Sequence, residues 1–230
     1  MHDSEISAIT LSLLMGFCSV ALNLVPGVAT AWIFSRCTFR GKALLETFVF
    51  LPLVIPPVVT GYFLIRIFNQ QSLVGAILNR LDVQVVFTWT GMAVAGAVMS
   101  FALLVRTVRG VLDEINPRLE QAARSLGYSP LRTFFKVTLP LAWPGIVAGS
   151  VLCFARTLGE FGATVMISAG TAGNRTIPLE IFHHYQTPGH ETEMMRLVVV
   201  SIAISSAALV VSEMLIARLG ATRYRPHHGG

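Results

Sequence analysis

The sequence predicts an all-α, polytopic membrane helical bundle of about five transmembrane helices, which form a single domain over residues 1–230. Hydrophobic residues make up 53% of the chain and charged residues 13%, whereas a soluble domain carries about a quarter charged residues. Five apolar runs reach the roughly 20 residues that cross a bilayer. They lie near residues 7–34, 43–68, 87–105, 141–167 and 195–217. Too few residues remain between them for a separate nucleotide-binding or receptor domain.

The basic residues predict which side of the membrane each loop faces. Three segments on one side hold 12 of the 17 Lys and Arg residues. They are Arg36, Arg40 and Lys42; Arg106, Arg109, Arg118, Arg124, Arg132 and Lys136; and Arg218, Arg223 and Arg225. By the positive-inside rule this side is cytoplasmic. We therefore expect a multi-pass protein of the cytoplasmic (inner) membrane, with its N-terminus outside and its C-terminus in the cytoplasm. The pI of about 9.6 then reflects membrane topology and not nucleic-acid binding.

The second apolar run contains three prolines, Pro52, Pro56 and Pro57. Each proline removes a backbone donor and bends a helix, and in lipid the freed carbonyl groups need other partners. Two interpretations stay open. The run is either a bent helix that lines a pore, with Pro56 and Pro57 as gating candidates, or a purely architectural bend.

Two polar stretches, residues 69–86 and 170–194, are predicted to be loops on the outer side. The second stretch holds a group of residues that could suggest a metal site, namely His183, His184, His190 and Glu191. Adjacent histidines on a helix point in different directions, and no second ligand motif accompanies them. We therefore expect exposed loop residues and no metal.

The three cysteines, Cys18, Cys37 and Cys153, are far apart and lack the spacing of metal ligands. A free cysteine in an apolar run packs like a small hydrophobic residue. We expect that role for all three.

The longest segment between the apolar runs is predicted to form two short helices over residues 117–140. Asn116 is placed to cap the first helix, and Pro117 suits its first turn. Gly127 suits the left-handed turn that ends it. Ser129 is then placed to cap the second helix, with Pro130 in its first turn.

The first of these helices has two distinct faces. An apolar stripe at helical spacing is formed by Leu119, Ala122, Ala123 and Leu126. On the polar side Glu120 precedes Arg124 by four residues, the order that favours an ion pair. Such a helix can lie on lipid or dock against a protein. The small side chains of Ala122 and Ala123 favour protein contact, because they anchor poorly in lipid.

This segment resembles the cytoplasmic motif of permease subunits of bacterial ABC importers. That motif begins Glu-Ala-Ala, has Gly six residues after the Glu, and ends in aliphatic-x-Leu-Pro. The matching residues here are Gln121, Ala122, Ala123, Gly127, Val137, Leu139 and Pro140. Gln121 stands where the general motif has Glu, and its amide can still accept and donate hydrogen bonds. The neighbouring Glu120 is turned about 100° away around the helix.

Other strings extend the resemblance over nearly the whole chain to the molybdate permease family. They are RCTFRGKALLE (36–46), LPLVIPPVVTGY (51–62), LEQAARSLG (119–127), FARTLGEFGATV (154–165) and TIPLEIFHHYQTPG (176–189). The Leu-Gly-Glu-Phe-Gly-Ala string favours molybdate over sulfate. The resemblance thus implies the transmembrane subunit of a type I ABC importer, which forms the pore for molybdate or, alternatively, for sulfate or tungstate.

The resemblance also implies a set of partners. Two copies of this chain would form the pore in the lipid bilayer, and a periplasmic or extracellular molybdate-binding protein would deliver the anion. Two separate ABC ATPase subunits would bind ATP and Mg. They would dock on Leu119, Glu120, Gln121, Ala122, Ala123, Leu126 and Gly127. This chain has no GxxxxGK[ST] P-loop, so we expect it to have no ATPase activity, catalytic residue or cofactor of its own.

The fourth apolar run carries two charges, Arg156 and Glu160, at a spacing that allows them to pair. Ionisable residues within spans face the bundle or water and are candidates for function. The alternative is a structural pair that fixes helix packing. A direct contact with the transported oxyanion is less favoured, because Glu160 offsets the attraction of Arg156 and a pore needs weak contacts.

Two rival classes of protein are weighed against this prediction. An intramembrane enzyme would need a nucleophile–base pair or a metal cluster at membrane depth, which the spans lack. A stand-alone channel or ion-driven carrier would not copurify with an ATPase.

Overall fold

The structure is a computed structural model that describes residues 3–168, 170–171 and 173–221, with side chains as far as residue 214. Within these residues the chain is helical and has no β-strand. The α-helices are α1 (Asp3–Arg36), α2 (Lys42–Phe50), α3 (Pro57–Phe68), α4 (Leu73–Arg80), α5 (Trp89–Glu114), α6 (Pro117–Ser125), α7 (Pro130–Thr133), α8 (Leu139–Leu158), α9 (Gly162–Ile167), α10 (Ile177–Gln186) and α11 (Glu191–Ala221). A 3-10 helix, η1 (Leu51–Leu53), follows α2, and a π-helix, η2 (Phe134–Thr138), joins α7 to α8.

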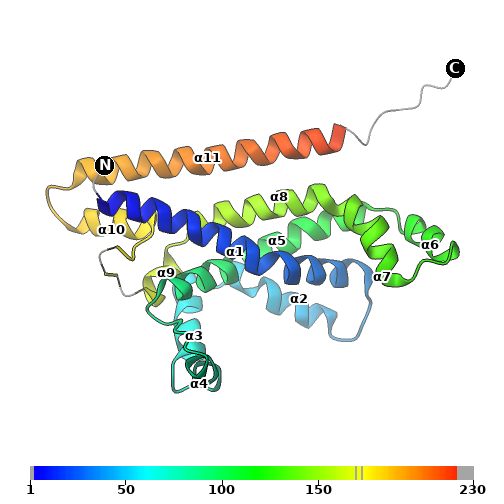
Figure 1. The fold of residues 1–230 in the computed structure, drawn as a ribbon, viewed down its shortest axis with the longest axis horizontal. Helices are drawn as coiled ribbons and strands as arrows, with labels where there is room; N and C mark the ends of the chain where they lie inside the picture. The colour runs from blue at the N-terminus through cyan, green and yellow to red at the C-terminus, as the bar shows by residue number, and fades with distance from the viewer. Residues whose placement is uncertain (1–2, 169, 172, 222–230) are drawn as a thin grey trace.

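The long helices α1, α5, α8 and α11 run along the length of the molecule (Figure 1). The central helix is α5, which packs against both α1 and α8, while α11 packs on α8. In the most apolar window of α5, 67% of the residues are buried, against 6% in that of α11. The bundle is therefore built around α5, and most of α11 is left for lipid or another chain to cover.

Small residues on α5 let its neighbours approach closely. A Cβ atom added at Gly96 would lie 2.5 Å from Thr157 Cγ2 of α8, so the two helices meet at this glycine. On α1, a Cβ at Gly27 would lie 2.4 Å from Leu104 Cδ2 of α5. Close packing through small residues is the usual way in which membrane helices associate.

Four helices within the described residues are long and apolar enough to cross a membrane: Asp3–Arg36, Trp89–Glu114, Pro130–Leu158 and Glu191–Met214. A fifth span results if the bent pair Lys42–Leu53 and Pro57–Phe68 is counted as one. This agrees with the prediction of about five spans in an all-α bundle.

The second predicted span differs from a single bent helix. Its two halves are inclined by 109°, and α3 turns away from the bundle with α4 at its tip (Figure 1). The break falls where Pro56 caps α3 and Pro57 occupies its first turn. Consecutive prolines remove two backbone donors in a row, so the helix ends and restarts in a new direction.

The fourth predicted span, 141–167, is also divided. It extends further back than expected, because the apolar helix is continuous from Pro130 to Leu158. It then breaks at Gly159–Phe161 before the short α9. The sequence around the break contains Gly159 and Gly162, and glycine weakens a helix at such a point.

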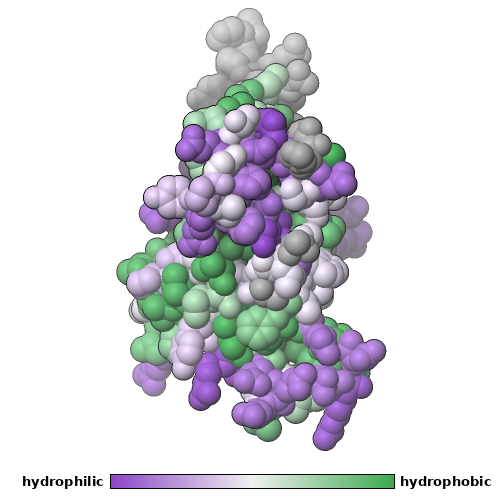
Figure 2. All heavy atoms as spheres, turned by 90° about the vertical axis from the view of Figure 1, so that its left-hand side faces the viewer, coloured by the Kyte–Doolittle hydropathy of each residue, from purple (hydrophilic) through white to green (hydrophobic). Residues whose placement is uncertain are grey.

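The two stretches predicted as outer loops each contain a helix, α4 and α10. Ser72 starts α4 by accepting a hydrogen bond on Oγ from the Gly75 backbone N–H, at 2.9 Å. Figure 2 shows this end of the molecule, where hydrophilic surface gathers toward α10 and at the tip that carries α4, with hydrophobic surface between them. His183 and His184 therefore lie on a helix and not in a loop, and His184 is buried.

The opposite end carries α6 and α7, together with the last turns of α1 and α5 (Figure 1). Arg118 lies on α6, Arg132 lies on α7, and Arg40 lies in the connection that follows α1, so we call this region the basic end. Arg223 and Arg225 lie outside the described residues.

One ion pair ties the first helix to the last. Arg196 of α11 donates from Nε and Nη2 to Glu5 Oε1 of α1, at 3.1 and 2.9 Å. The Glu5 side chain is fully buried. This contact joins residues that are 191 positions apart in the chain.

Candidate functional site

The helix α6 is a short element with both ends fixed. At its start, Asn116 Oδ1 accepts a hydrogen bond from the Arg118 backbone N–H at 3.0 Å, and Pro117 follows the cap. At its end, Gly127 adopts a φ of 87°. The Gly127 N–H donates to the Arg124 carbonyl at 2.9 Å, and the Tyr128 N–H donates to the Ala123 carbonyl at 3.1 Å. This pair of bonds is the Schellman motif, and it confirms the predicted cap at Gly127.

The exposed part of α6 is mixed, with apolar side chains beside polar ones such as Arg118 and Arg124. Leu119 is 50% exposed and Leu126 is 81% exposed, and Gln121 and Ala122 are exposed with them. Ala123 is buried, so one member of the predicted apolar stripe faces the body of the protein. Exposed leucines on a capped helix form a surface that a partner can cover. Docking of an ATPase there stays a prediction.

Glu120 does not pair with Arg124 as the helix spacing suggested. Its Oε1 accepts from Arg36 Nε of α1 at 3.0 Å and from Thr138 Oγ1 of η2 at 2.9 Å. The physical reason is burial, since the side chains of Arg36 and Glu120 are only 13% and 10% exposed. An exposed pair four residues apart is worth about 0.2–0.5 kcal/mol, less than charge-assisted bonds in a shielded site.

The predicted second helix is present but is not separate from the fourth span, because it continues into α8. Ser129 Oγ accepts from the Arg132 N–H at 3.3 Å and Pro130 follows it, as expected. After one turn, however, the chain changes to the π-helix η2. Phe134 packs there edge-on against Trp32 of α1, with ring centroids 5.8 Å apart. Extra turns of this kind often occur at functional positions within helices.

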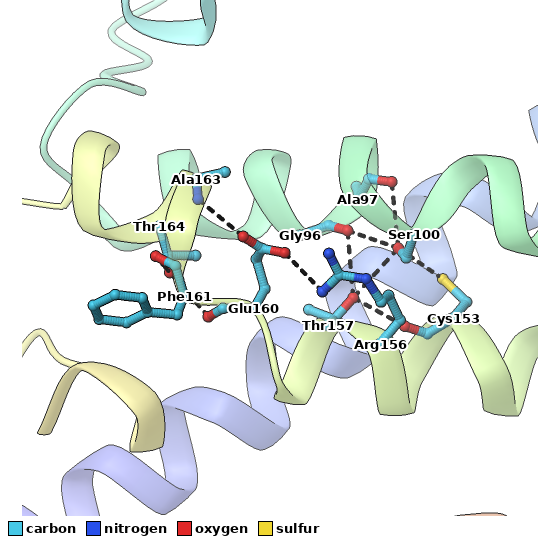
Figure 3. A network of polar contacts seen from close by, with 10 residues as sticks. All are labelled: Gly96, Ala97, Ser100, Cys153, Arg156, Thr157, Glu160, Phe161, Ala163 and Thr164. Atoms are coloured by element: carbon cyan, nitrogen blue, oxygen red, sulfur yellow. Dashed lines mark hydrogen bonds and ion pairs between the residues drawn. The ribbon is translucent and has the colours of Figure 1, made fainter. Parts of the chain in front are cut away.

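The charges of the fourth span pair as predicted (Figure 3). Arg156 Nη1 lies 2.7 Å from Glu160 Oε2. The second oxygen, Oε1, accepts from the Ala163 backbone N–H at 2.9 Å. The Glu160 side chain is 1% exposed and that of Arg156 is 31% exposed. Glu160 therefore accepts a hydrogen bond from a backbone N–H in the first turn of α9. Its other oxygen pairs with Arg156, so both carboxylate oxygens are engaged.

The structure brings the two chain breaks together. The start of α3 lies against the start of α9, since a Cβ at Gly162 would fall 2.7 Å from Pro57 Cβ. One turn further on, a Cβ at Gly61 would fall 2.8 Å from the Ala163 carbonyl oxygen. Pro57 of the second predicted span and Glu160 of the fourth thus belong to one site.

Beside this site lies a buried polar network between α1, α5 and α8 that the sequence analysis missed. Asn23 Nδ2 donates to the Ala97 carbonyl at 2.8 Å and to Ser100 Oγ at 3.2 Å. Cys153 Sγ donates to the same Ser100 Oγ at 3.1 Å, so this cysteine is more than an apolar packing residue. Thr157 Oγ1 reaches Ser100 Oγ at 3.3 Å (Figure 3). The sequence feature that could have indicated this network was the presence of single polar residues within otherwise apolar runs.

The histidines were expected to be exposed and not to bind a metal. Among the described residues, no three metal-ligating side chains gather at one point. His184 Nε2 instead lies 3.6 Å from Glu180 Oε1, and Glu180 Oε2 accepts from Arg175 Nη1 at 3.2 Å. His190 stacks on His184 with ring centroids 5.3 Å apart. These side chains fasten α10 to the turn that follows it and to the segment that precedes it.

Comparison with known proteins gives a consistent result. The sequence profile of the family described as "Binding-protein-dependent transport system inner membrane component" matches residues 27–226. The molybdenum transport system permease protein ModB of Escherichia coli K12 is 45% identical over 217 residues, which are 94% of this chain and 95% of that protein. The ModB of Haemophilus influenzae is 43% identical over the same shares of the two chains. The sulfate permease CysT of Salmonella typhimurium is 39% identical over 74% of this chain and 62% of its own length.

Solved structures share the fold at low sequence identity. The MetNI methionine ABC transporter in an inward-facing conformation contains a chain with a TM-score of 0.73 and 19% identity, over 95% of this chain and 99% of that one. A bacterial alginate ABC transporter, in complex with a periplasmic protein bound to an alginate pentasaccharide, gives a TM-score of 0.75 and 15% identity, over 95% of this chain and 80% of that one.

Proposed function

This chain belongs to the family of inner-membrane components of binding-protein-dependent transport systems, and from this we propose that it is the permease subunit of an ATP-driven molybdate importer. The observation that carries the proposal is the 45% identity to the Escherichia coli molybdenum permease over nearly the full length of both chains. The sulfate permease of Salmonella typhimurium matches at a lower identity of 39%. Sulfate and tungstate are therefore the alternative cargoes.

The proposed orientation puts the basic end in the cytoplasm. Arg40, Arg118 and Arg132 at that end support it through the positive-inside rule. The start of α1 and the helices α4 and α10 then face outward, toward a periplasmic molybdate-binding protein. The C-terminus is cytoplasmic.

The proposed assembly contains a second copy of this chain and two ABC ATPase subunits, which bind ATP and Mg. Each ATPase covers the outward face of one α6, at Leu119, Gln121, Ala122 and Leu126. Large apolar side chains on α2 and after η1 are also exposed, including Leu44 at 79%, Phe48 at 73% and Val54 at 82%. In a membrane these side chains are covered by lipid or by the second copy.

In the proposed cycle, ATP draws the two ATPase subunits together and they carry α6 with them. The movement reaches α8 through the continuous helix Pro130–Leu158. At the far end of α8, Glu160 holds α9, and α9 lies against Pro57 of α3. A shift of α8 therefore changes the contact between the two broken spans and opens the pathway outward. Hydrolysis of ATP resets it inward.

The charge pair has a defined place in this proposal. Both oxygens of Glu160 are engaged, by Arg156 and by the Ala163 N–H, so the pair holds α9 in position. It is not assigned as a ligand of the anion.

The proposal is tested by uptake into vesicles that contain this permease, its ATPase and its binding protein. We expect accumulation of radiolabelled molybdate that requires ATP and persists in an excess of unlabelled sulfate. A complex whose ATPase has a substituted P-loop lysine is the control and should accumulate none. Import of sulfate but not molybdate would show that the cargo is sulfate. Failure to copurify with any ATPase would contradict the assignment as an ABC permease.

A further inference from the structure

Glu120 is the residue through which α6 is bonded to the rest of the protein. Glu120 and Ala123 are the buried residues of this nine-residue helix. The Ala123 methyl group buries little surface, so the principal contact is polar. Glu120 Oε1 accepts from Arg36 Nε at 3.0 Å and from Thr138 Oγ1 at 2.9 Å.

Arg36 extends this contact to the end of α5. Its Nη2 donates to the Ile115 carbonyl at 3.1 Å, and its Nη1 donates to Ser35 Oγ at 3.3 Å. Ile115 is the residue that ends α5, and Thr138 directly precedes α8. The contact therefore joins α6 to the ends of the three helices that form the centre of the bundle.

The segment that contains α6 is joined to α5 and α8 by the chain, but it has no such covalent connection to α1. The helices α5 and α8 are continuous with the segment 115–138, whereas Glu120 and Arg36 are 84 positions apart. Trp32 and Phe134 also meet between α1 and η2, but a ring contact can slide. Charge-assisted hydrogen bonds are directional and stronger than neutral ones, so they transmit displacement without slipping.

We propose that the Arg36–Glu120–Thr138 contact is the rigid link through which movement of α6 displaces α1 together with α8. Glu120 is then a positioning residue that faces away from the ATPase and not part of the docking surface. This inference rests on the proposed function, because it assumes that an ATPase moves α6.

The test measures the number of anions imported per ATP hydrolysed by the reconstituted complex. Glu120→Gln keeps the shape of the side chain and removes its charge. Arg36→Lys keeps the charge and removes the fork of donors that reaches Glu120 and the Ile115 carbonyl at once. In both variants we expect the ATPase to copurify, and the number of anions imported per ATP to fall on the order of fivefold or more. The matched control is Glu114→Gln, an exposed carboxylate nearby at the end of α5, which should leave the ratio unchanged.

Three results would overturn the link. The first is a wild-type import ratio in both Glu120→Gln and Arg36→Lys. The second is loss of ATPase binding in Glu120→Gln with a normal ratio in the complexes that remain, which would make Glu120 a docking residue. The third result comes from Thr138→Val, and it applies where neither Glu120→Gln nor Arg36→Lys assembles. Thr138→Val removes one bond to Glu120 at nearly constant volume, and a normal ratio in that variant would make the contact purely structural.

An incorrect assignment of the cargo can be distinguished from a failure of the proposed link. The ratio is measured with whichever of molybdate, tungstate and sulfate the wild-type complex carries. A change of anion therefore revises the proposed function and leaves the test of the link intact.

Discussion

The carboxylate of Glu160 performs two structural tasks at once. One oxygen meets the Arg156 guanidinium and the other meets the first turn of α9. In a buried carboxylate with both oxygens engaged, these contacts replace the hydration lost on burial. The side chain thereby sets the direction in which the chain leaves α8.

Substitution of Glu160 separates these tasks. Glu160→Gln retains an oxygen for the Ala163 N–H and loses the ion pair, whereas Glu160→Leu loses both. We expect the glutamine variant to assemble, to be less stable by about 1–3 kcal/mol and to import less per complex. The leucine variant should be affected more. Thermal unfolding of the detergent-solubilised complex and uptake in vesicles measure the two effects.

Glu191→Gln serves as the control, because Glu191 is exposed at the start of α11. If both Glu160 variants match the wild type in unfolding and in uptake, neither interaction matters to the protein.

Gly127 is required by its backbone conformation and not by lack of space. Its φ is 87°, and a Cβ added there would meet nothing within 4 Å. We expect Gly127→Ala to weaken the end of α6 by about 1–2 kcal/mol and to reduce ATPase binding, since an L-residue resists this conformation. Gly127→Asn should retain most binding, because Asn tolerates the left-handed region. Copurification with the ATPase is the measurement.

A matched control is Gly110→Ala, where a Cβ also meets nothing but the glycine lies within α5. That change should be neutral or mildly stabilising. Equal ATPase binding by the Gly127→Ala variant and the wild type would show that the turn after α6 does not determine docking.

At the scale of elements, α6 has an outward face and an inward face, and two neighbouring alanines lie on different faces. Ala122 is exposed and Ala123 is 7% exposed. Ala122→Glu should disrupt ATPase binding and leave the thermal stability of the isolated permease unchanged. Ala123→Glu should lower that stability as well, because it buries a charge without a partner. Comparison of copurification with thermal unfolding separates the two variants. The assignment of faces would be wrong if Ala122→Glu unfolded the permease and Ala123→Glu did not.

The elements show which features the sequence could predict. Caps at Asn116, Gly127 and Ser129 were predictable because each depends on residues within one or two turns. The ion pair of Arg156 and Glu160 was predictable for the same reason. The partner of Glu120 was not, since Arg36 lies 84 positions earlier and helix spacing offered Arg124 instead.

The breaks in the spans were predictable in position but not in size. Pro56 and Pro57 indicated a bend, but the 109° angle depends on the packing of α3 against α9. Long-range packing of this kind leaves no periodic signal in the sequence.

For the molecule as a whole, the predicted topology can be tested with single cysteines. We expect Arg40→Cys and Arg118→Cys to be protected from an impermeant thiol reagent in intact cells. Gln71→Cys and Gly173→Cys should be labelled. The reason is the concentration of basic residues at the end that carries α6. Labelling of Arg118→Cys from outside intact cells would reverse the orientation.

The background for this experiment must lack the native cysteines. Serine is the suitable replacement for Cys153, because it can preserve the bond to Ser100. Labelling after the cells are opened is the control, and all four positions should then react.

The Glu5–Arg196 pair has a consequence for how the protein is synthesised. At about 5–20 residues per second, the 191 positions that separate them take roughly 10–40 s to translate. During that interval α1 is already available to enter the bilayer while the arginine that will meet its carboxylate does not yet exist. In that interval α1 can already pack against α5, the central helix of the bundle. The first helix to be made therefore gains its ion pair with the last helix only after Arg196 has been translated.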